Sequence, residues 1–427
     1  MPATADARAG RAAFTHPGFV LFQIARFLIV SAVEMQAVAV GWQVYEITKR
    51  PLDLGYVGLA QFLPAILLFP ISGHASDRFE RRNVLSACYA GYAVCFALLI
   101  ALAQRSVPSI TAIYVVLVMI GVVRSFNSTA SRAILPQLVP TEHFPNAVAW
   151  NASIFQAATI LGPAFGGFLY AAVKGPSVVY VVAMLTAIGA TISSFRIKPE
   201  VKARPREPMS LKTVFAGLDF IWRKKLILGA ISLDLFAVLL GGAVALLPVY
   251  AREILHTGPW GLGLLRAAPG VGAAIMAVLL AHSPLRGRSG PTLLWAVAAF
   301  GVFTIIFGLS HSLTVSLIAL LLLGASDMIS VIIRATLTQL ATPDEMRGRV
   351  TAVDMIFIGT SNEFGQFESG VTAQWFGTVP AVVLGGIGTL VVIAVWAWMF
   401  PELRQAGDLG EIRSDELPDA AGTTTPQ

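Results

Sequence analysis

Long apolar runs recur along the whole 427-residue chain, separated by mostly short polar stretches. A helical run of about 20 apolar residues crosses roughly 30 Å of hydrocarbon at 1.5 Å per residue. Charged residues make up 13% of the chain, against about 25% in an ordinary soluble domain. The mean hydropathy is +0.73. The sequence therefore predicts an all-α integral membrane protein.

Interruptions by proline, glycine and charge divide the chain into twelve predicted transmembrane helices. Their approximate ranges are 19–46, 54–75, 84–104, 108–132, 146–173, 176–195, 226–251, 259–282, 290–310, 313–337, 350–376 and 379–400. An even number of spans predicts that both termini lie on the same side of the membrane.

Positive charges between the spans predict which side that is. With both termini in the cytosol, 20 Lys and Arg residues fall in cytosolic segments and only Lys49, Arg50, Arg105, Lys174 and Arg252 fall outside. Cytosolic loops carry such an excess. The charge excess also indicates topology rather than nucleic-acid binding, because the basic residues do not gather on a soluble face.

Polar segments divide the chain into five parts. These are a cytosolic segment at 1–18 with no cleavable signal peptide, a six-helix bundle at 19–196, a cytosolic linker with an amphipathic helix at 197–225, a second six-helix bundle at 226–400, and a disordered cytosolic tail at 401–427. We expect the amphipathic helix to lie on the inner leaflet, because its apolar residues have helical spacing and its end is basic.

A repeat indicates that the two bundles are related. The segments starting at Arg132 (Arg-Ala-Ile-Leu-Pro-Gln-Leu) and Arg334 (Arg-Ala-Thr-Leu-Thr-Gln-Leu) agree at five of seven positions, 202 residues apart. Two fused bundles related by an axis along the membrane normal would leave this trace. Both arginines stand at the inner ends of their helices, where we expect them to anchor loops.

The short loop after the second span is strongly charged and includes Gly73, Asp77, Arg78, Arg81 and Arg82. Gly73 would allow two helix ends to approach closely, and the arginines can anchor at anionic headgroups. Asp77 either caps its helix or latches the inner gate when it closes. This loop resembles the signature between helices 2 and 3 of the major facilitator superfamily, whose members are transporters.

Helix 5 carries a second signature, Gly162-Pro163-Ala-Phe-Gly166-Gly167. It resembles the glycine and proline motif of exporters in that superfamily, which implies a tightly packed bend that restricts leak. A plain small-residue packing face is the alternative.

Motifs along residues 15–404 are similar to the superfamily branch that includes the enterobactin exporter. They include Pro136-Gln-Leu-Val-Pro140, Thr342-Pro-Asp-Glu-Met-Arg-Gly-Arg-Val350 and Ser361-Asn-Glu-Phe-Gly-Gln-Phe-Glu-Ser-Gly370. The resemblance implies the family fold. The two glutamates of helix 11 depart from the branch and weaken any assignment of that substrate.

Ionisable residues inside spans are costly, by roughly 2.5 to 3.5 kcal/mol each, so each needs a partner or a wet cavity. The candidates are Arg26, Glu34, Arg124, Asp234, Arg266, Asp327, Glu363 and Glu368. The resemblance implies that helices 1, 4, 7 and 10 line the central cavity. It also implies a coupling role for an arginine near Arg124.

We expect Glu34 and Arg124 to be neighbours, either as a proton-coupling unit or as a static salt bridge. Asp234 and Asp327, with no nearby cation, could take up a proton or bind a cationic group. Glu363 and Glu368 point about 140° apart on one helix, so at most one of them faces the cavity directly. Arg266 is expected to snorkel to the outer interface.

Cavity residues Gln36, Phe126, Asn127 and Gln156 would suit an amphipathic, partly aromatic solute. The sequence thus predicts a monomeric, proton-coupled exporter of a siderophore-like compound or drug in the bacterial inner membrane. It shows no nucleotide-binding loop and no pattern for a catalytic site, metal or cofactor. An uptake carrier of the same fold, and a transport-dead sensor or scaffold, are the alternatives.

Overall fold

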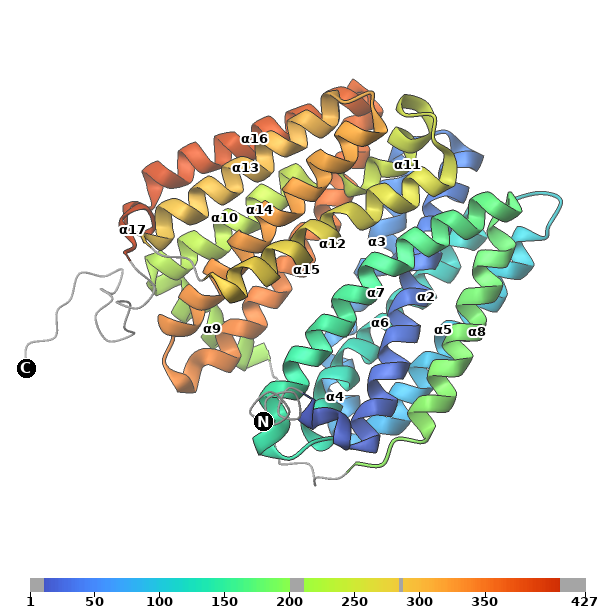
Figure 1. Ribbon diagram of the computed structural model, residues 1–427, viewed down its shortest axis with the longest axis horizontal. Coiled ribbons are helices and arrows are strands. Elements are labelled where there is room, and N and C mark those ends of the chain that lie inside the picture. Colours follow the sequence, from blue (N-terminus) through green and yellow to red (C-terminus); the bar gives the residue numbers. More distant parts are fainter. Residues whose placement is uncertain (1–10, 200–210, 284–286, 408–427) are drawn as a thin grey trace, which may run out of the picture. The chain divides into compact units, whose positions relative to one another are not determined.

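The computed structural model describes residues 11–199, 211–283 and 287–407. The side chains of residues 69, 70, 76, 77 and 211–214 also lie outside the described part. Within it the chain is helical and contains no strand (Figure 1). Its contacts divide the chain into unit 1 (residues 1–49, 60–208 and 257–267) and unit 2 (50–59, 209–256 and 268–427).

Elements from the first half of the chain contain the first six predicted spans. They are η1 (Ala12–Thr15), α2 (Pro17–Thr48), α3 (Pro51–Leu67), α4 (Phe69–Arg78), α5 (Arg81–Ala103), α6 (Ile110–Ile134), η2 (Leu135–Gln137), η3 (Thr141–His143), α7 (Phe144–Val173) and α8 (Pro176–Phe195).

Elements from the second half contain the amphipathic helix and the last six spans. They are α9 (Leu211–Arg223), α10 (Lys225–Gly241), η4 (Ala243–Leu246), α11 (Leu247–Val249), η5 (Tyr250–Ile254), α12 (Gly258–His282), α13 (Ser289–Leu309), α14 (Leu313–Leu340), α15 (Asp344–Phe376), α16 (Thr378–Met399) and α17 (Pro401–Gln405).

Ten of the described helical segments are long and apolar enough to cross a membrane. The remaining two predicted spans are present as helices but differ in character. The second is divided at Leu68 into α3 and α4, and the eleventh, α15, is 33 residues long but more polar than the others. The twelve predicted spans are therefore confirmed as helices, and the fold is that of two six-helix bundles.

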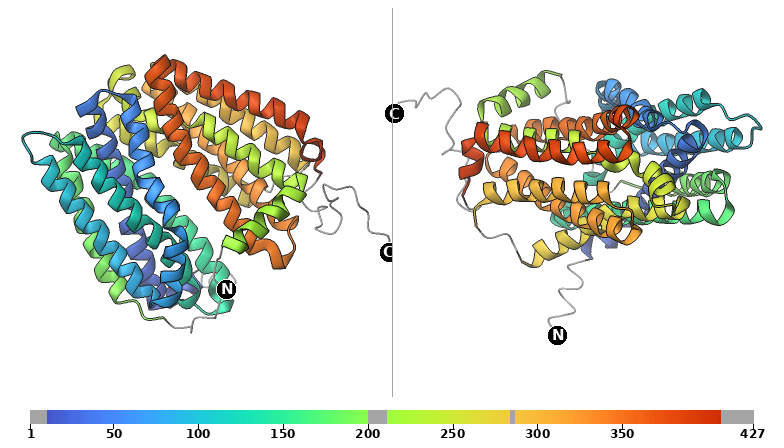
Figure 2. Two further views of the ribbon diagram at one scale, coloured as in Figure 1. Left: turned by 180° about the vertical axis from the view of Figure 1, so that it is seen from behind. Right: turned by 90° about the horizontal axis from the view of Figure 1, so that it is seen from above.

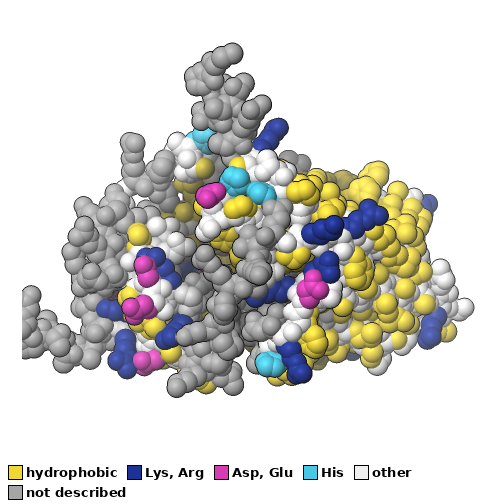
Figure 3. All heavy atoms as spheres, turned by 90° about the horizontal axis from the view of Figure 1, so that it is seen from below, with side chains coloured by type: hydrophobic (Ala, Val, Ile, Leu, Met, Phe, Trp, Pro, Cys, Tyr) yellow, Lys and Arg dark blue, Asp and Glu magenta, His cyan; other side chains and the backbone are white. Residues whose placement is uncertain are grey.

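Within unit 1, α2 packs between α7 and α8, and α5 packs against α6 and α8 (Figure 1). Within unit 2, α13 packs against α14 and α16, and α10 packs against α15 and α16 (Figure 2). One view of the surface shows a broad hydrophobic area next to a region where charged side chains gather (Figure 3). This separation is typical of a protein whose helices face lipid.

The predicted boundaries of the two bundles differ in detail from the contact-defined units. Residues 50–59, the first part of α3, belong to unit 2, and residues 257–267, mostly the first part of α12, belong to unit 1. The hydropathy pattern divides the chain at its long polar linker and contains no information on which bundle a helix end contacts.

The amphipathic helix α9 packs against α15 and α10 of unit 2. Ile221 is fully buried in a cluster with Ile227 and Val350. A Cβ atom added at Gly217 would lie 2.7 Å from the carbonyl oxygen of Arg349. The predicted amphipathic helix therefore uses one face to dock on its own bundle, and Phe215 and Trp222 remain exposed.

Candidate functional site

A cavity of about 300 Å³ lies inside unit 2. Its walls come from α10, α12, α13, α14, α15 and the η4 segment, and most of the lining side chains are apolar or small. Four polar residues face it from three helices: Asp234 on α10, Asp327 and Arg334 on α14, and Asn362 on α15.

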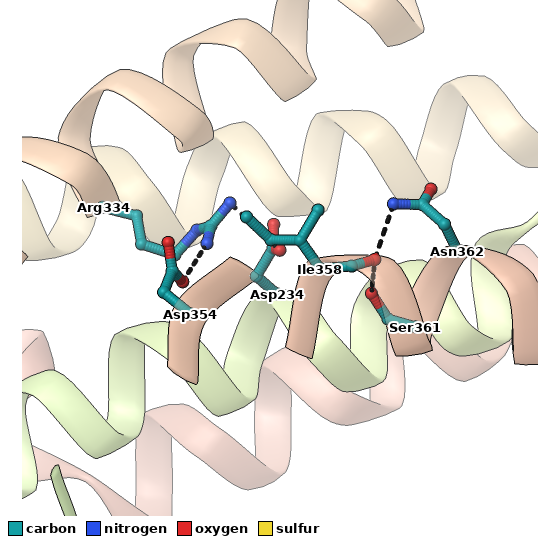
Figure 4. Close-up of polar contacts among 6 residues, drawn as sticks. All are labelled: Asp234, Arg334, Asp354, Ile358, Ser361 and Asn362. Atoms are coloured by element: carbon teal, nitrogen blue, oxygen red, sulfur yellow. Dashed lines mark hydrogen bonds and ion pairs between the residues drawn. The ribbon is translucent and has the colours of Figure 1, made fainter. Parts of the chain in front are cut away.

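Arg334 joins two acids from two other helices (Figure 4). Its Nη2 atom lies 3.2 Å from Oδ2 of Asp234, and its Nη1 atom donates to Oδ1 of Asp354 at 2.6 Å. The exposed fractions of the Arg334 and Asp234 side chains are only 4% and 9%. This ion triad links α10, α14 and α15 in the interior of the bundle.

The charges of this region do not balance. Arg334 pairs with Asp234 and Asp354, and a third acid, Asp327, lines the same cavity as Asp234 and Arg334. The Arg334 Nε atom is buried without a hydrogen-bond partner. Because unpaired charge is expensive in a low-dielectric interior, the surplus negative charge favours uptake of a proton or of a cationic group.

Local backbone breaks help to shape the cavity. The α-helical part of α10 ends at Gly241, and the chain passes through a short 3₁₀ turn before it becomes helical again. Ser369 on α15 donates its hydroxyl to the carbonyl of Gly242 at 2.9 Å, which satisfies one group freed by the break. Gly241 and Gly242 also line the cavity, where the absence of side chains leaves space.

These contacts correct two predictions. Asp234 was expected to have no nearby cation, yet Arg334 pairs with it; Arg334 was expected to anchor a loop, yet it is buried among helices. Asp354 was missed altogether. The spacing offered a signal for Arg334, since it follows Asp327 by seven residues, about two helical turns, and so shares its face.

The glutamates of α15 have local hydrogen bonds. The amide of Gln366 donates to Oε2 of Glu363 at 3.2 Å, and Thr372 donates to Oε1 of Glu368 at 2.6 Å. Glu363 is buried. Neither residue lines the cavity in unit 2. The residues of α15 that line it are Ile358 and Asn362. A coupling role for Glu363 remains a prediction.

In unit 1, Glu34 on α2 faces the first part of α12. Its Oε2 atom lies 4.0 Å from Nε of Arg266, and snorkelling of Arg266 to the outer interface remains a prediction. The predicted neighbourhood of Glu34 and Arg124 remains a prediction. Arg124 is exposed on α6.

The glycines of the α7 motif pack closely against neighbouring helices. A Cβ atom added at Gly162 would lie 2.7 Å from Cβ of Glu34, and one added at Gly166 would lie 2.8 Å from Cα of Met35. Gly167 instead contacts Gly263 in the first part of α12. α7 stays helical through Pro163. A role in restricting leak remains a prediction.

The predicted solute-contacting residues lie in different surroundings. Gln36 is fully buried and neither amide atom has a partner, so it exposes no surface to a solute in this structure. Phe126, Asn127 and Gln156 are partly buried on α6 and α7. Asn127 accepts a hydrogen bond from Ser131 at 3.4 Å.

The charged loop after α4 behaves differently from the prediction. Arg81 donates to the carbonyl of Ala133 at 3.0 Å, and Arg82 donates to that of Ile197 at 3.3 Å, so both bind the ends of neighbouring helices rather than reaching only for headgroups. No described atom lies within 4 Å of a Cβ added at Gly73, so no close helix approach occurs there. Arg78 is exposed. The Asp77 side chain lies outside the described residues, and its gate role remains a prediction.

Among the described residues, no group of three or more His, Cys, Asp or Glu side chains could hold a metal ion. The arrangement instead offers buried, paired charges on helices around a cavity. Such residues in membrane spans typically mark pathways for ions or solutes.

The profile of the Major Facilitator Superfamily matches residues 18–366. The chain belongs to this superfamily. Over 404 residues it is 28% identical to the enterobactin exporter EntS of Citrobacter koseri, with 92% of this chain and 94% of that protein covered. EntS of an Escherichia coli O81 strain is also 28% identical over the same shares of the two chains.

Solved structures of other superfamily members share the fold. The D-xylose–proton symporter superimposes with a TM-score of 0.70 at 13% identity, over 95% of this chain and 99% of that one. A bacterial homologue of the lysosomal transporter Spinster, inward-facing and occupied, gives a TM-score of 0.70 at 12% identity, over 91% and 97% of the two chains. The present chain is thus a multi-pass membrane transporter, not an enzyme, and alternating access fits its fold.

Proposed function

We propose that this transporter exports a small amphipathic molecule, of the siderophore or drug class, in exchange for protons. It acts as a monomer in the inner membrane, with both termini in the cytosol. Similarity to enterobactin exporters along 92% of the chain supports the direction and the substrate class. The observation that carries the proton coupling is Arg334, which pairs with Asp234 and Asp354 beside a cavity of unit 2 that Asp327 also lines.

The proposed mechanism starts from the ion triad. When both acids are charged, Arg334 holds α10 and α15 against α14 through Asp234 and Asp354. A proton that enters the cavity neutralises one carboxylate and weakens its bond to Arg334, because the attraction between opposite charges is lost. The three helices can then rearrange, which converts proton binding into a change of conformational population.

Transport by purified protein in proteoliposomes tests this proposal, with enterobactin and a panel of amphipathic dyes as solutes. An imposed pH gradient should drive each accepted solute against the direction of proton flow. Asp234→Asn and Asp354→Asn should lose uphill transport while downhill exchange of solute persists. Asp344→Asn is the matched control, because that acid begins the same helix as Asp354 but is 84% exposed.

Each alternative gives a different result. A solute that moves in the same direction as the protons indicates an uptake carrier. Transport that ignores the pH gradient and stops without sodium indicates another coupling ion. A protein that moves none of the solutes down their gradients would support the transport-dead sensor.

A further inference from the structure

Helices α2 and α10 have residues of opposite charge at the same distance from their first residues. Arg26 stands nine residues after the first residue of α2, and Asp234 stands nine residues after the first residue of α10. The repeat also aligns Arg132 with Arg334. In unit 2, Arg334 has the acid Asp234 beside it, whereas in unit 1 the residue nine positions into α2 is a second arginine, Arg26.

The third member of the unit 2 triad is Asp354, and an aromatic residue stands at a similar distance along α7 of unit 1. Asp354 stands ten residues after the start of α15, and Phe155 stands eleven residues after the start of α7. The guanidinium of Arg26 lies over the Phe155 ring, 5.2 Å from its centroid. In unit 1 an aromatic ring therefore lies beside Arg26, whereas in unit 2 acids lie beside Arg334.

Arg26 has no ion pair among the described residues, although it is partly buried within a span. Its Nε atom is buried without a hydrogen-bond partner. Tyr89 and Arg132 lie near enough to Arg26 to interact with it electrostatically. An arginine in a membrane span is stable only with a partner or water, and the ring alone supplies a modest cation–π attraction.

Other polar atoms near these positions along the helices also lack partners. Gln23, one turn before Arg26 on α2, is 3% exposed and neither of its amide atoms makes a hydrogen bond. Asn151, one turn before Phe155 on α7, has a buried Oδ1 atom without a partner. Buried polar groups usually have partners, so these orphans indicate a place where a polar ligand completes the bonding.

We propose that unit 1 contains a subsite for an anionic oxygen group attached to an aromatic ring, with Arg26 binding the anion and Phe155 stacking beside it. The subsite rests on the proposed transport function, because it assigns the charge of the solute. A guanidinium suits a carboxylate, which it can bind with two parallel hydrogen bonds. The exposed face of Phe155, with 42% of the residue accessible, offers apolar contact to the ring.

Equilibrium binding to the full-length protein in detergent or nanodiscs tests the subsite without any gradient. Salicylate and salicylamide are the probes, since they share a ring and differ in charge. Wild type should bind salicylate about 10-fold more tightly than salicylamide, as expected for a charge-assisted pair. Arg26→Gln should reduce this preference to about 1-fold, and Arg26→Lys should retain part of it. Arg105→Gln, an exposed loop arginine, is the matched control and should behave as wild type.

Arg132→Gln provides a second reading should Arg26→Gln fail to fold, because Arg132 is exposed. Arg132→Gln should lower the affinity for salicylate by about 3-fold, as expected for a screened charge, and leave the affinity for salicylamide unchanged. Equal affinity of wild type for the two probes, no salicylate binding at millimolar concentration, or an unchanged preference in these variants would overturn the subsite. Because no proton gradient is present, failure of proton coupling would leave these results unaffected.

Discussion

At the scale of single residues, Arg334 decides the stability of the unit 2 interior. Removing one partner of a buried ion pair leaves an uncompensated charge, whereas an exposed pair contributes little. Arg334 has two acid partners, so its loss strands both Asp234 and Asp354. The loss of Asp234 alone leaves Arg334 paired with Asp354.

We therefore expect Arg334→Gln to lower the free energy of unfolding by about 3–5 kcal/mol. Asp234→Asn should cost less. Thermal unfolding in detergent, followed by intrinsic fluorescence, would show which of the two variants is less stable. Arg347→Gln is the control. Arg347 pairs with Asp344 at the start of α15, and at least half of each side chain is exposed. Equal stability of Arg334→Gln and Arg347→Gln would show that the triad is not structural.

The sequence predicted the acids of this region better than their partner. Asp234 and Asp327 stand out because they interrupt apolar spans. Arg334 was placed at a helix end, since α14 was expected to stop at residue 337, whereas it continues to Leu340. Asp354 lies inside the expected span 350–376, four positions after its first residue, and was not singled out among the charges within spans. Small boundary errors thus change whether a charged residue is read as buried or as part of a loop.

At the scale of elements, the glycines of α7 bring it close to α2. The two helices form one of the most extensive contacts in unit 1. Close packing through small residues is how membrane helices associate, because lipid tails compete with apolar side chains. At Gly166 there is no room for a side chain, since an added Cβ would meet the backbone of Met35.

Gly166→Val should therefore lower stability by about 1–3 kcal/mol, the usual cost of overpacking. The melting temperature of purified protein and its yield from membranes would report the loss. Gly175→Ala is the matched control, because a Cβ atom there meets nothing within 4 Å. If the Gly166→Val protein had the same melting temperature as wild type, α2 and α7 could separate freely, contrary to the close packing at Gly166.

Hydropathy predicted the helices but not their breaks. The division between α3 and α4 at Leu68 follows Pro64, which cannot donate a backbone hydrogen bond. The break after Gly241 in α10 was not predicted, because glycine is common in membrane helices. These breaks depend on tertiary contacts, such as the bond from Ser369 to Gly242.

At the scale of the whole molecule, fused bundles with one repeat have diverged in charge. The arginine of the repeat has acid partners in unit 2, while in unit 1 a second arginine stands near it in the fold. We therefore expect unit 2 to bind a proton or a cation and unit 1 to bind an anion. The repeat itself was visible in the sequence, but the change of partners was not, because those partners come from different helices.

The orientation of the whole molecule follows from its loops. With 20 basic residues in the segments that include both termini and 5 in the opposite loops, the termini should face the cytosol. A cysteine at Arg105 should then react with a membrane-impermeant maleimide in right-side-out vesicles. A cysteine at Arg404 should react in inverted vesicles. Both positions are exposed.

The wild-type chain is the control for this measurement. Its two cysteines, Cys88 and Cys95, are both buried, so the reagent should label it in neither kind of vesicle. Labelling of Arg404→Cys in right-side-out vesicles, with Arg105→Cys protected, would show that the orientation is the opposite one. Reversal would also change the meaning of the transport data, because the face from which protons reach the triad would be exchanged. The labelling experiment therefore comes before any assignment of transport direction.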